Sequence, residues 1–86
     1  MLDRPRRHHI SSAIVVTHPG RANAIASILA EIENVEVHAS QHGKIVIVIE
    51  GHSTGELGET LVGISAMDGV IAAHMVFEQV LDEQEE

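Results

Sequence analysis

Apolar and polar positions along the chain follow two different periods, and the shorter period predicts four strands. Residues 35–40 alternate valine or alanine with glutamate, histidine and serine, which is the period-two pattern of a strand with one buried face. The runs at 10–17, 44–50 and 70–77 are rich in β-branched residues and are also typical of strands. Glycines and a proline flank these runs and mark the turns between elements.

Two stretches between the strands have the period of a helix. After Arg21 the apolar positions lie on one face of a helix that ends at Asn34, and they are Ala22, Ile25, Ile28, Leu29 and Ile32. A second helix has Ser53 or Thr54 as its N-cap, ends at Asp68-Gly69, and carries the stripe Leu57, Leu61 and Ile64. The chain therefore alternates strands and helices in the order β-α-β-β-α-β.

This order predicts an α+β fold of the split βαβ type. The strands form a four-stranded antiparallel sheet in the spatial order 4-1-3-2, with both helices on one face. We expect a single domain at 9–78, a flexible basic arm at 1–8 and an acidic flexible tail at 79–86. The other face of the sheet must then meet solvent, a second subunit or a ligand.

The hairpin between the second and third strands indicates which side chains reach that uncovered face. A three-residue turn at 41–43 predicts the pairs Ser40 with Lys44, His38 with Val46, and Glu36 with Val48. In the last strand the bulkier alternate set is predicted to fill the core, namely Ile71, Ala73, Met75 and Phe77. The residues left to point outward are Val70, His74, Val76 and Glu78.

The first strand allows two interpretations, because large apolar residues occur on both of its sides. Ile10, Ile14 and Val16 compete with Ala13 and Val15, and we prefer Ile14 and Val16 outward. The candidate binding site is then an apolar stripe made of Ile14, Val16, Val46, Val48 and Val76. Its rim consists of Glu36, His38, Glu50, His74 and Glu78. Such a stripe usually marks an interaction site, although sheet-to-sheet dimerisation or scattered surface valines give the same pattern.

Charge and composition narrow the classes of function. Beyond Arg7 the chain carries twelve acidic residues and only two basic ones, Arg21 and Lys44. We therefore expect a cationic partner and no binding to nucleic acid, although an acidic surface also serves solubility. The absence of cysteine removes disulfides and thiolate chemistry and favours the cytosol. No segment approaches the ~20 apolar residues of a membrane span, so no membrane insertion is expected.

Catalytic and metal chemistry find weak support in the sequence. The seven histidines are dispersed, and the adjacent pair His8-His9 lies in the arm, so no metal site is predicted. Arg21 and Asn23 begin the first helix and suggest the anion cradle of acylphosphatase-type enzymes, but the glycine-rich loop around the arginine is missing. A proline that enters the helix is the simpler explanation. We therefore predict no enzyme activity and no cofactor.

Four segments of the predicted strands form a recognisable set, namely His9-Ile-Ser-Ser-Ala-Ile-Val-Val16, Val35-Glu-Val-His38, Gly43-Lys-Ile-Val-Ile-Val-Ile-Glu50 and Asp68-Gly-Val-Ile-Ala-Ala-His-Met-Val76. Together they resemble the NapD family, and the similarity runs from about His9 to Glu78. The resemblance implies a ferredoxin-like fold without iron and sulfur and a cytoplasmic chaperone. It also implies that the protein binds the twin-arginine signal peptide of the periplasmic nitrate reductase catalytic subunit. By binding this peptide, the chaperone restrains export of the subunit until molybdenum cofactor insertion is complete.

The family has no invariant catalytic set to map, so the predicted site residues rest on sheet geometry. We expect a monomer or weak dimer. Two other functions stay open, an ACT-like regulatory domain that binds a metabolite at a dimer interface and the acylphosphatase-type enzyme. A dimer that buries the uncovered face at every concentration would favour the first of these.

Overall fold

Two βαβ halves make up the fold, as the sequence predicts. The computed structural model describes residues 7–82, with the side chains of 8–80, and the outer parts of the predicted arm and tail, 1–6 and 83–86, lie outside the described residues. The elements are β1 (Arg7–Thr17), α1 (Ala22–Ala30), β2 (Val35–Gln41), β3 (Lys44–Gly51), α2 (Thr54–Ser65) and β4 (Val70–Asp82).

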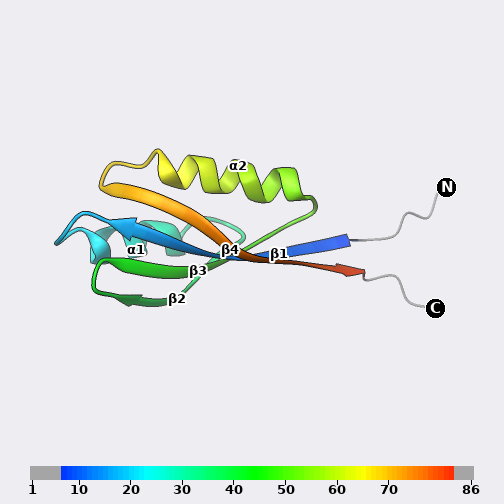
Figure 1. The fold of residues 1–86 in the computed structure, drawn as a ribbon, viewed down its shortest axis with the longest axis horizontal. Coiled ribbons are helices and arrows are strands. Elements are labelled where there is room, and N and C mark those ends of the chain that lie inside the picture. The colour runs from blue at the N-terminus through cyan, green and yellow to red at the C-terminus, as the bar shows by residue number, and fades with distance from the viewer. Residues whose placement is uncertain (1–6, 83–86) are drawn as a thin grey trace.

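The four strands form one antiparallel sheet in the order β2-β3-β1-β4, which is the predicted order counted from the other edge. The helix α1 packs against β2 and β3, and α2 packs against β1, β3 and β4. Figure 1 shows α1 behind the sheet and α2 along its β4 side. Both helices therefore cover the same face, and the other face is left without a helix.

The core lies between the sheet and the two helices. Its buried side chains are Ala13, Val15, Ile25, Leu29, Val35, Ile45, Ile47, Ile49, Leu57 and Ile64. In β1 the odd-numbered residues from Ser11 to Thr17 are all buried, whereas the even-numbered residues between them are only half-buried. Because strand side chains alternate between faces, Ile14 and Val16 point away from the helices, and this prediction is confirmed.

The β2–β3 turn is one residue shorter than predicted. Gln41 pairs directly with Lys44, which leaves His42 and Gly43 as the turn. Both have positive φ, 55° for His42 and 76° for Gly43, as a type I′ turn requires. The tighter turn matches the right-handed twist of the two strands, which explains why it replaces the predicted three-residue connection.

The shorter turn changes part of the predicted register. The predicted pairs Ser40–Lys44 and His38–Val46 are wrong, and the observed pairs are Ser40–Ile45 and Ala39–Val46. A register shift between Val37 and Ala39 leaves His38 as the extra residue of a β-bulge. The bulge absorbs the one-residue offset, so the predicted pair Glu36–Val48 is confirmed.

Two further bulges disturb the alternation of β4. Register shifts against β1 leave Ile71 and Val76 as extra residues. Each one moves the next part of the strand to the opposite face. As a result Ile71 and Phe77, both predicted in the core, are 55% and 59% exposed. Ala73 and Met75 pack against the core as predicted.

The same shifts reverse two residues that were predicted to point outward. Val70 pairs with the buried Thr17 and packs against the core. Glu78 pairs with the buried Ser11, and its Oε2 accepts a hydrogen bond of 2.7 Å from Thr54 at the start of α2. Glu78 therefore lies on the helix side and does not belong to the predicted rim.

The strands β1 and β4 continue beyond the helices as a two-stranded ribbon, visible at the right of Figure 1. Their pairing reaches from Arg7 to Asp82, so residues 7–8 and 79–82, which were predicted in the arm and tail, belong to strands. Composition misplaced these limits because backbone hydrogen bonds between two strands need no apolar side chains.

Candidate functional site

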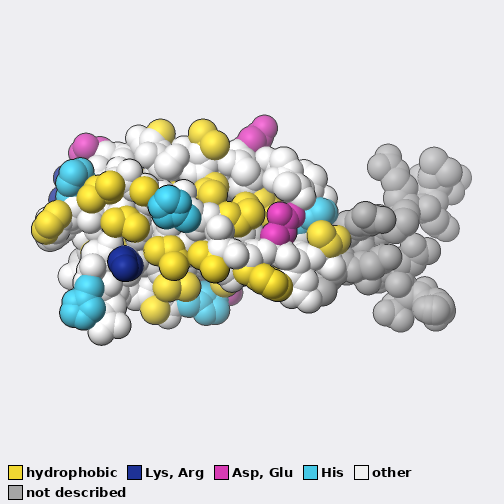
Figure 2. Space-filling model, viewed as in Figure 1, with side chains coloured by type: hydrophobic (Ala, Val, Ile, Leu, Met, Phe, Trp, Pro, Cys, Tyr) yellow, Lys and Arg dark blue, Asp and Glu magenta, His cyan; other side chains and the backbone are white. Residues whose placement is uncertain are grey.

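The sheet face without helices, called the open face from here on, carries a contiguous set of apolar side chains. The backbone register assigns to it Ile10, Ile14, Val16, Val46, Val48, Val76 and Phe77. These residues come from β1, β3 and β4, three strands that lie side by side. Figure 2 shows the corresponding band of hydrophobic side chains across the face. Apolar patches of this kind mark interaction sites on small proteins.

Cross-strand pairing arranges the open face in four rows. From the β2–β3 turn toward the ribbon, the first row is Gln41, Lys44, Val16 and Ala72, and the second is Ala39, Val46, Ile14 and His74. The third row is Glu36, Val48, Ser12 and Phe77, and the fourth is Glu50, Ile10 and Gln79. Apolar side chains thus occur in every row, with Lys44 in the first row, Glu36 in the third and Glu50 in the fourth.

The nine residues predicted for the site all lie on the open face. They are Ile14, Val16, Glu36, His38, Val46, Val48, Glu50, His74 and Val76. His38 reaches it as the extra residue of the β2 bulge, next to Ala39. The structure brings these side chains together on one surface, and their part in binding stays a prediction.

Sequence reasoning missed two apolar members of the open face, Ile10 and Phe77. Phe77 is the one aromatic residue of the chain, and strict alternation along β4 places it in the core. The bulge at Val76 instead puts two consecutive large side chains on the open face. The pair Val76-Phe77 was the available signal, but adjacent apolar residues also fit a strand that is buried on both faces.

Both glutamates of the open face are paired with histidines. His38 Nε2 lies 3.1 Å from Glu36 Oε1, and His8 Nε2 lies 3.1 Å from Glu50 Oε1. The Glu36 side chain is largely exposed and that of Glu50 is half-buried. Because an ionised carboxylate has about four acceptor sites, one histidine contact leaves room for a guanidinium group.

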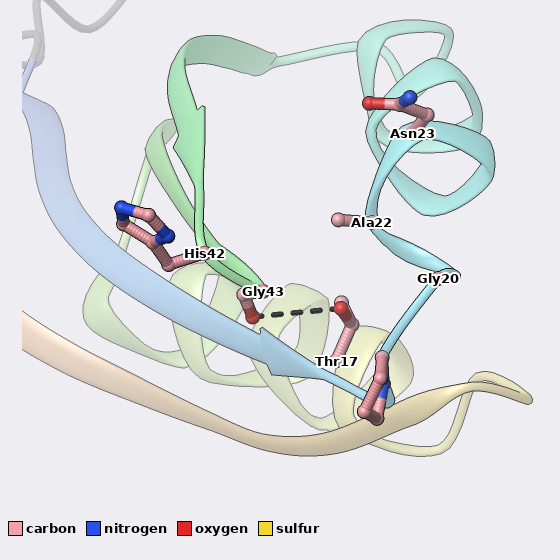
Figure 3. Close-up of a pocket in the computed structure, with 7 residues that line it drawn as sticks. Thr17, Gly20, Ala22, Asn23, His42 and Gly43 are labelled. Atoms are coloured by element: carbon pink, nitrogen blue, oxygen red, sulfur yellow. Dashed lines mark hydrogen bonds between the residues drawn. The ribbon is translucent and has the colours of Figure 1, made fainter.

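The anion cradle suggested for Arg21 and Asn23 does not form. Asn23 lines a pocket where the β1–α1 loop meets the β2–β3 turn, together with Thr17, Pro19, Gly20, Ala22, His42 and Gly43 (Figure 3). Arg21 is not part of that lining, and its Nη2 lies 3.3 Å from Asp68 Oδ2. The arginine is thus held by a carboxylate on the α2–β4 loop.

A metal centre finds no support within residues 7–82, where no group of three or more His, Cys, Asp or Glu side chains could hold an ion. In the same part of the chain, neither helix has the length and apolar content needed to cross a membrane. The open face is therefore the candidate functional site.

Comparisons with known proteins point in one direction. A family model described as NapD protein matches residues 8–82. The chaperone NapD of Paracoccus pantotrophus is 51% identical over 79 residues, which cover 90% of this chain and 70% of that protein. The chaperone NapD of Haemophilus influenzae is 30% identical over 86 residues, which cover 98% and 91% of the two chains.

A solved structure shows the same fold. The solution structure of the E. coli Tat proofreading chaperone protein NapD is similar with a TM-score of 0.76 and 26% sequence identity. The match covers 92% of this chain and 84% of that chain. It confirms the predicted ferredoxin-like α+β architecture, and the observed strand order agrees with it.

Proposed function

The chain belongs to the NapD family of chaperones, and on this premise we propose that its open face binds the twin-arginine signal peptide of the periplasmic nitrate reductase catalytic subunit. In this proposal the protein acts in the cytoplasm and restrains export until molybdenum cofactor insertion is complete. The observation that carries the proposal is the apolar stripe on the sheet face that both helices leave uncovered.

The apolar stripe supplies the driving force for binding. Val46, Val76 and Phe77 all keep a large part of their surface exposed to water. A signal peptide carries an apolar segment behind a basic one, so docking removes apolar surface from water on both partners. Each Å² buried contributes about 25 cal/mol before the costs of association.

The glutamates of the open face supply a match for the paired arginines. Glu36 and Glu50 lie in adjacent rows beside the apolar side chains, on neighbouring strands. A guanidinium group binds a carboxylate through two parallel hydrogen bonds, which fix orientation as well as adding energy. At an exposed rim each pair contributes about 0.2–1 kcal/mol, so the arginines mainly provide specificity.

Titration of the isotope-labelled protein with the signal peptide, followed by NMR at low salt, tests the proposed binding. We expect saturable chemical-shift changes on Ile14, Val46, Val48 and Val76. A matched peptide with lysines in place of the two arginines keeps the charge but loses the bidentate contacts. Its dissociation constant should rise about threefold, because the two rim contacts together contribute about 0.7 kcal/mol.

The exposed residues of the helix layer serve as the internal control for this titration. Ile28 and Val62 lie on α1 and α2 and are exposed, so their signals should stay in place. Shifts confined to the helices would contradict the site, and the absence of saturable shifts with either peptide would contradict signal-peptide binding itself.

Restraint of export is tested in cells. When the gene for this protein is deleted, we expect the fraction of periplasmic nitrate reductase that lacks molybdenum to rise, because precursor reaches the export machinery before cofactor insertion. The readout is the molybdenum content of the purified periplasmic enzyme relative to its polypeptide. An unchanged metal content at unchanged enzyme amount would contradict the restraint, whatever the peptide titration shows.

A further inference from the structure

Charges on the open face are distributed asymmetrically along β3. Lys44 begins the strand in the row next to the β2–β3 turn, and Glu50 lies six residues later in the row next to the ribbon. Glu36 lies in the row beside that of Glu50. Because β3 rises about 3.4 Å per residue, the positive and negative ends of the face are separated by about 20 Å.

Charges outside the open face do not reverse this polarity. Arg21, the one other basic residue after Arg7, lies near the Lys44 end, and Asp68, 3.3 Å away, balances its charge. Toward the ribbon, Glu78 adds a carboxylate on the helix side of β4, opposite Ser11. The Lys44 end therefore stays the more positive of the two.

We propose that this polarity fixes the direction of the bound signal peptide, an inference that rests on the proposed function. The paired arginines lie against Glu36 and Glu50, and the apolar segment runs from there over Val48 and Val46 toward Lys44. The peptide is thus antiparallel to β3 and parallel to β1. Lys44 acts as a specificity residue, because its ammonium group repels a peptide that presents its arginines at the wrong end.

Two electrostatic effects favour the same direction. In twin-arginine and other export signals the basic region precedes the apolar one, so attraction between arginines and the two glutamates places the amino-terminal side at the ribbon end. If the segment binds as a helix, its macrodipole puts partial positive charge near Glu50 and partial negative charge near Lys44. Over about 20 Å this face accommodates roughly 13 helical or 6 extended residues.

Spin labels on the peptide test the direction. One synthetic signal peptide carries a nitroxide at its amino terminus, and a second carries it at the end of the apolar segment. Each is bound to the full-length isotope-labelled protein, and the paramagnetic broadening of backbone amides is measured. We expect the amino-terminal label to broaden Ile10 and Glu50 several-fold more than Val16 and Lys44, and the second label to give the reverse.

Two variants with the same change in net charge test the role of Lys44. Lys44→Gln removes the cation from the open face and should reduce the contrast between the two labels. Ser27→Asp adds one negative charge on the exposed side of α1 and should leave the contrast unchanged. An unaltered contrast in Lys44→Gln would overturn Lys44 as the residue that sets direction.

The outcomes separate this inference from the proposed function. Saturable binding with reversed broadening, or with equal broadening at both ends, overturns the fixed direction while peptide binding stands. If neither the labelled peptides nor the unlabelled one binds saturably, the proposed function is overturned, and the direction with it. Saturable binding with the expected pattern supports both.

Discussion

Replacing Ile47 by alanine is expected to lower the free energy of unfolding by about 3 kcal/mol. Ile47 is 0% exposed and lies in the middle of β3, paired with Ala13 on one side and Val37 on the other. Its truncation removes buried methyl groups and leaves a cavity that the surrounding sheet and helices fill only in part. Urea unfolding followed by far-UV circular dichroism measures the loss, since the chain has no tryptophan.

The neighbouring residue on the same strand provides the matched control. Val46 points to the open face and is 37% exposed, so Val46→Ala should cost less than about 1 kcal/mol of stability. The peptide titration should show the opposite order, with weaker binding in Val46→Ala and unchanged affinity in folded Ile47→Ala. Similar stability losses in the two variants would contradict the assignment of the two faces.

Replacing Phe77 by alanine should raise the dissociation constant for the signal peptide about tenfold, equivalent to 1.4 kcal/mol. Phe77 shares a row with Val48 and Ser12 on the open face and lies on β4, an edge strand of the sheet. An exposed aromatic side chain commonly contributes a large share of the energy of an interface, because it buries a large area at a low entropic cost. The NMR titration or isothermal calorimetry measures the change.

The stability of Phe77→Ala separates a binding role from a structural one. We expect the free energy of unfolding to fall by less than about 1 kcal/mol, whereas removal of a buried phenylalanine costs about 3–5 kcal/mol. Val62→Ala is the control, since Val62 is exposed on α2 in the helix layer and should change neither binding nor stability. A large loss of stability with unchanged affinity in Phe77→Ala would contradict the exposed position of Phe77 and indicate that it packs in the core.

Much of the candidate site was predictable because it depends on local pattern. Alternation in β2 and the β-branched run of β3 placed Glu36 opposite Val48 and put Val46 on the open face. In β1 Ala13 and Val15 are buried on the helix side, which agrees with the preferred orientation of Ile14 and Val16. These assignments hold because the period of two is maintained over the part of each strand that pairs without interruption.

The residues that sequence reasoning placed on the wrong face of the sheet lie at or close to a bulge of β4. Val70 and Ile71, at the start of β4, and Phe77 and Glu78, further along it, differ from the prediction because β4 has extra residues against β1. A bulge is decided by how two strands far apart in sequence fit their hydrogen bonds and twist together. Local sequence pattern alone does not specify such a fit.

The order of six elements, the antiparallel sheet with its helices on one face, the family and the chemical character of the open face could all be predicted from the amino-acid pattern. Folding was needed to fix the register near each bulge, the exposure of Phe77, the position of Glu78 beside α2 and the extension of β1 and β4 into a ribbon. Periodicity encodes which side chains avoid water, whereas the pairing of distant backbones sets where that periodicity is interrupted.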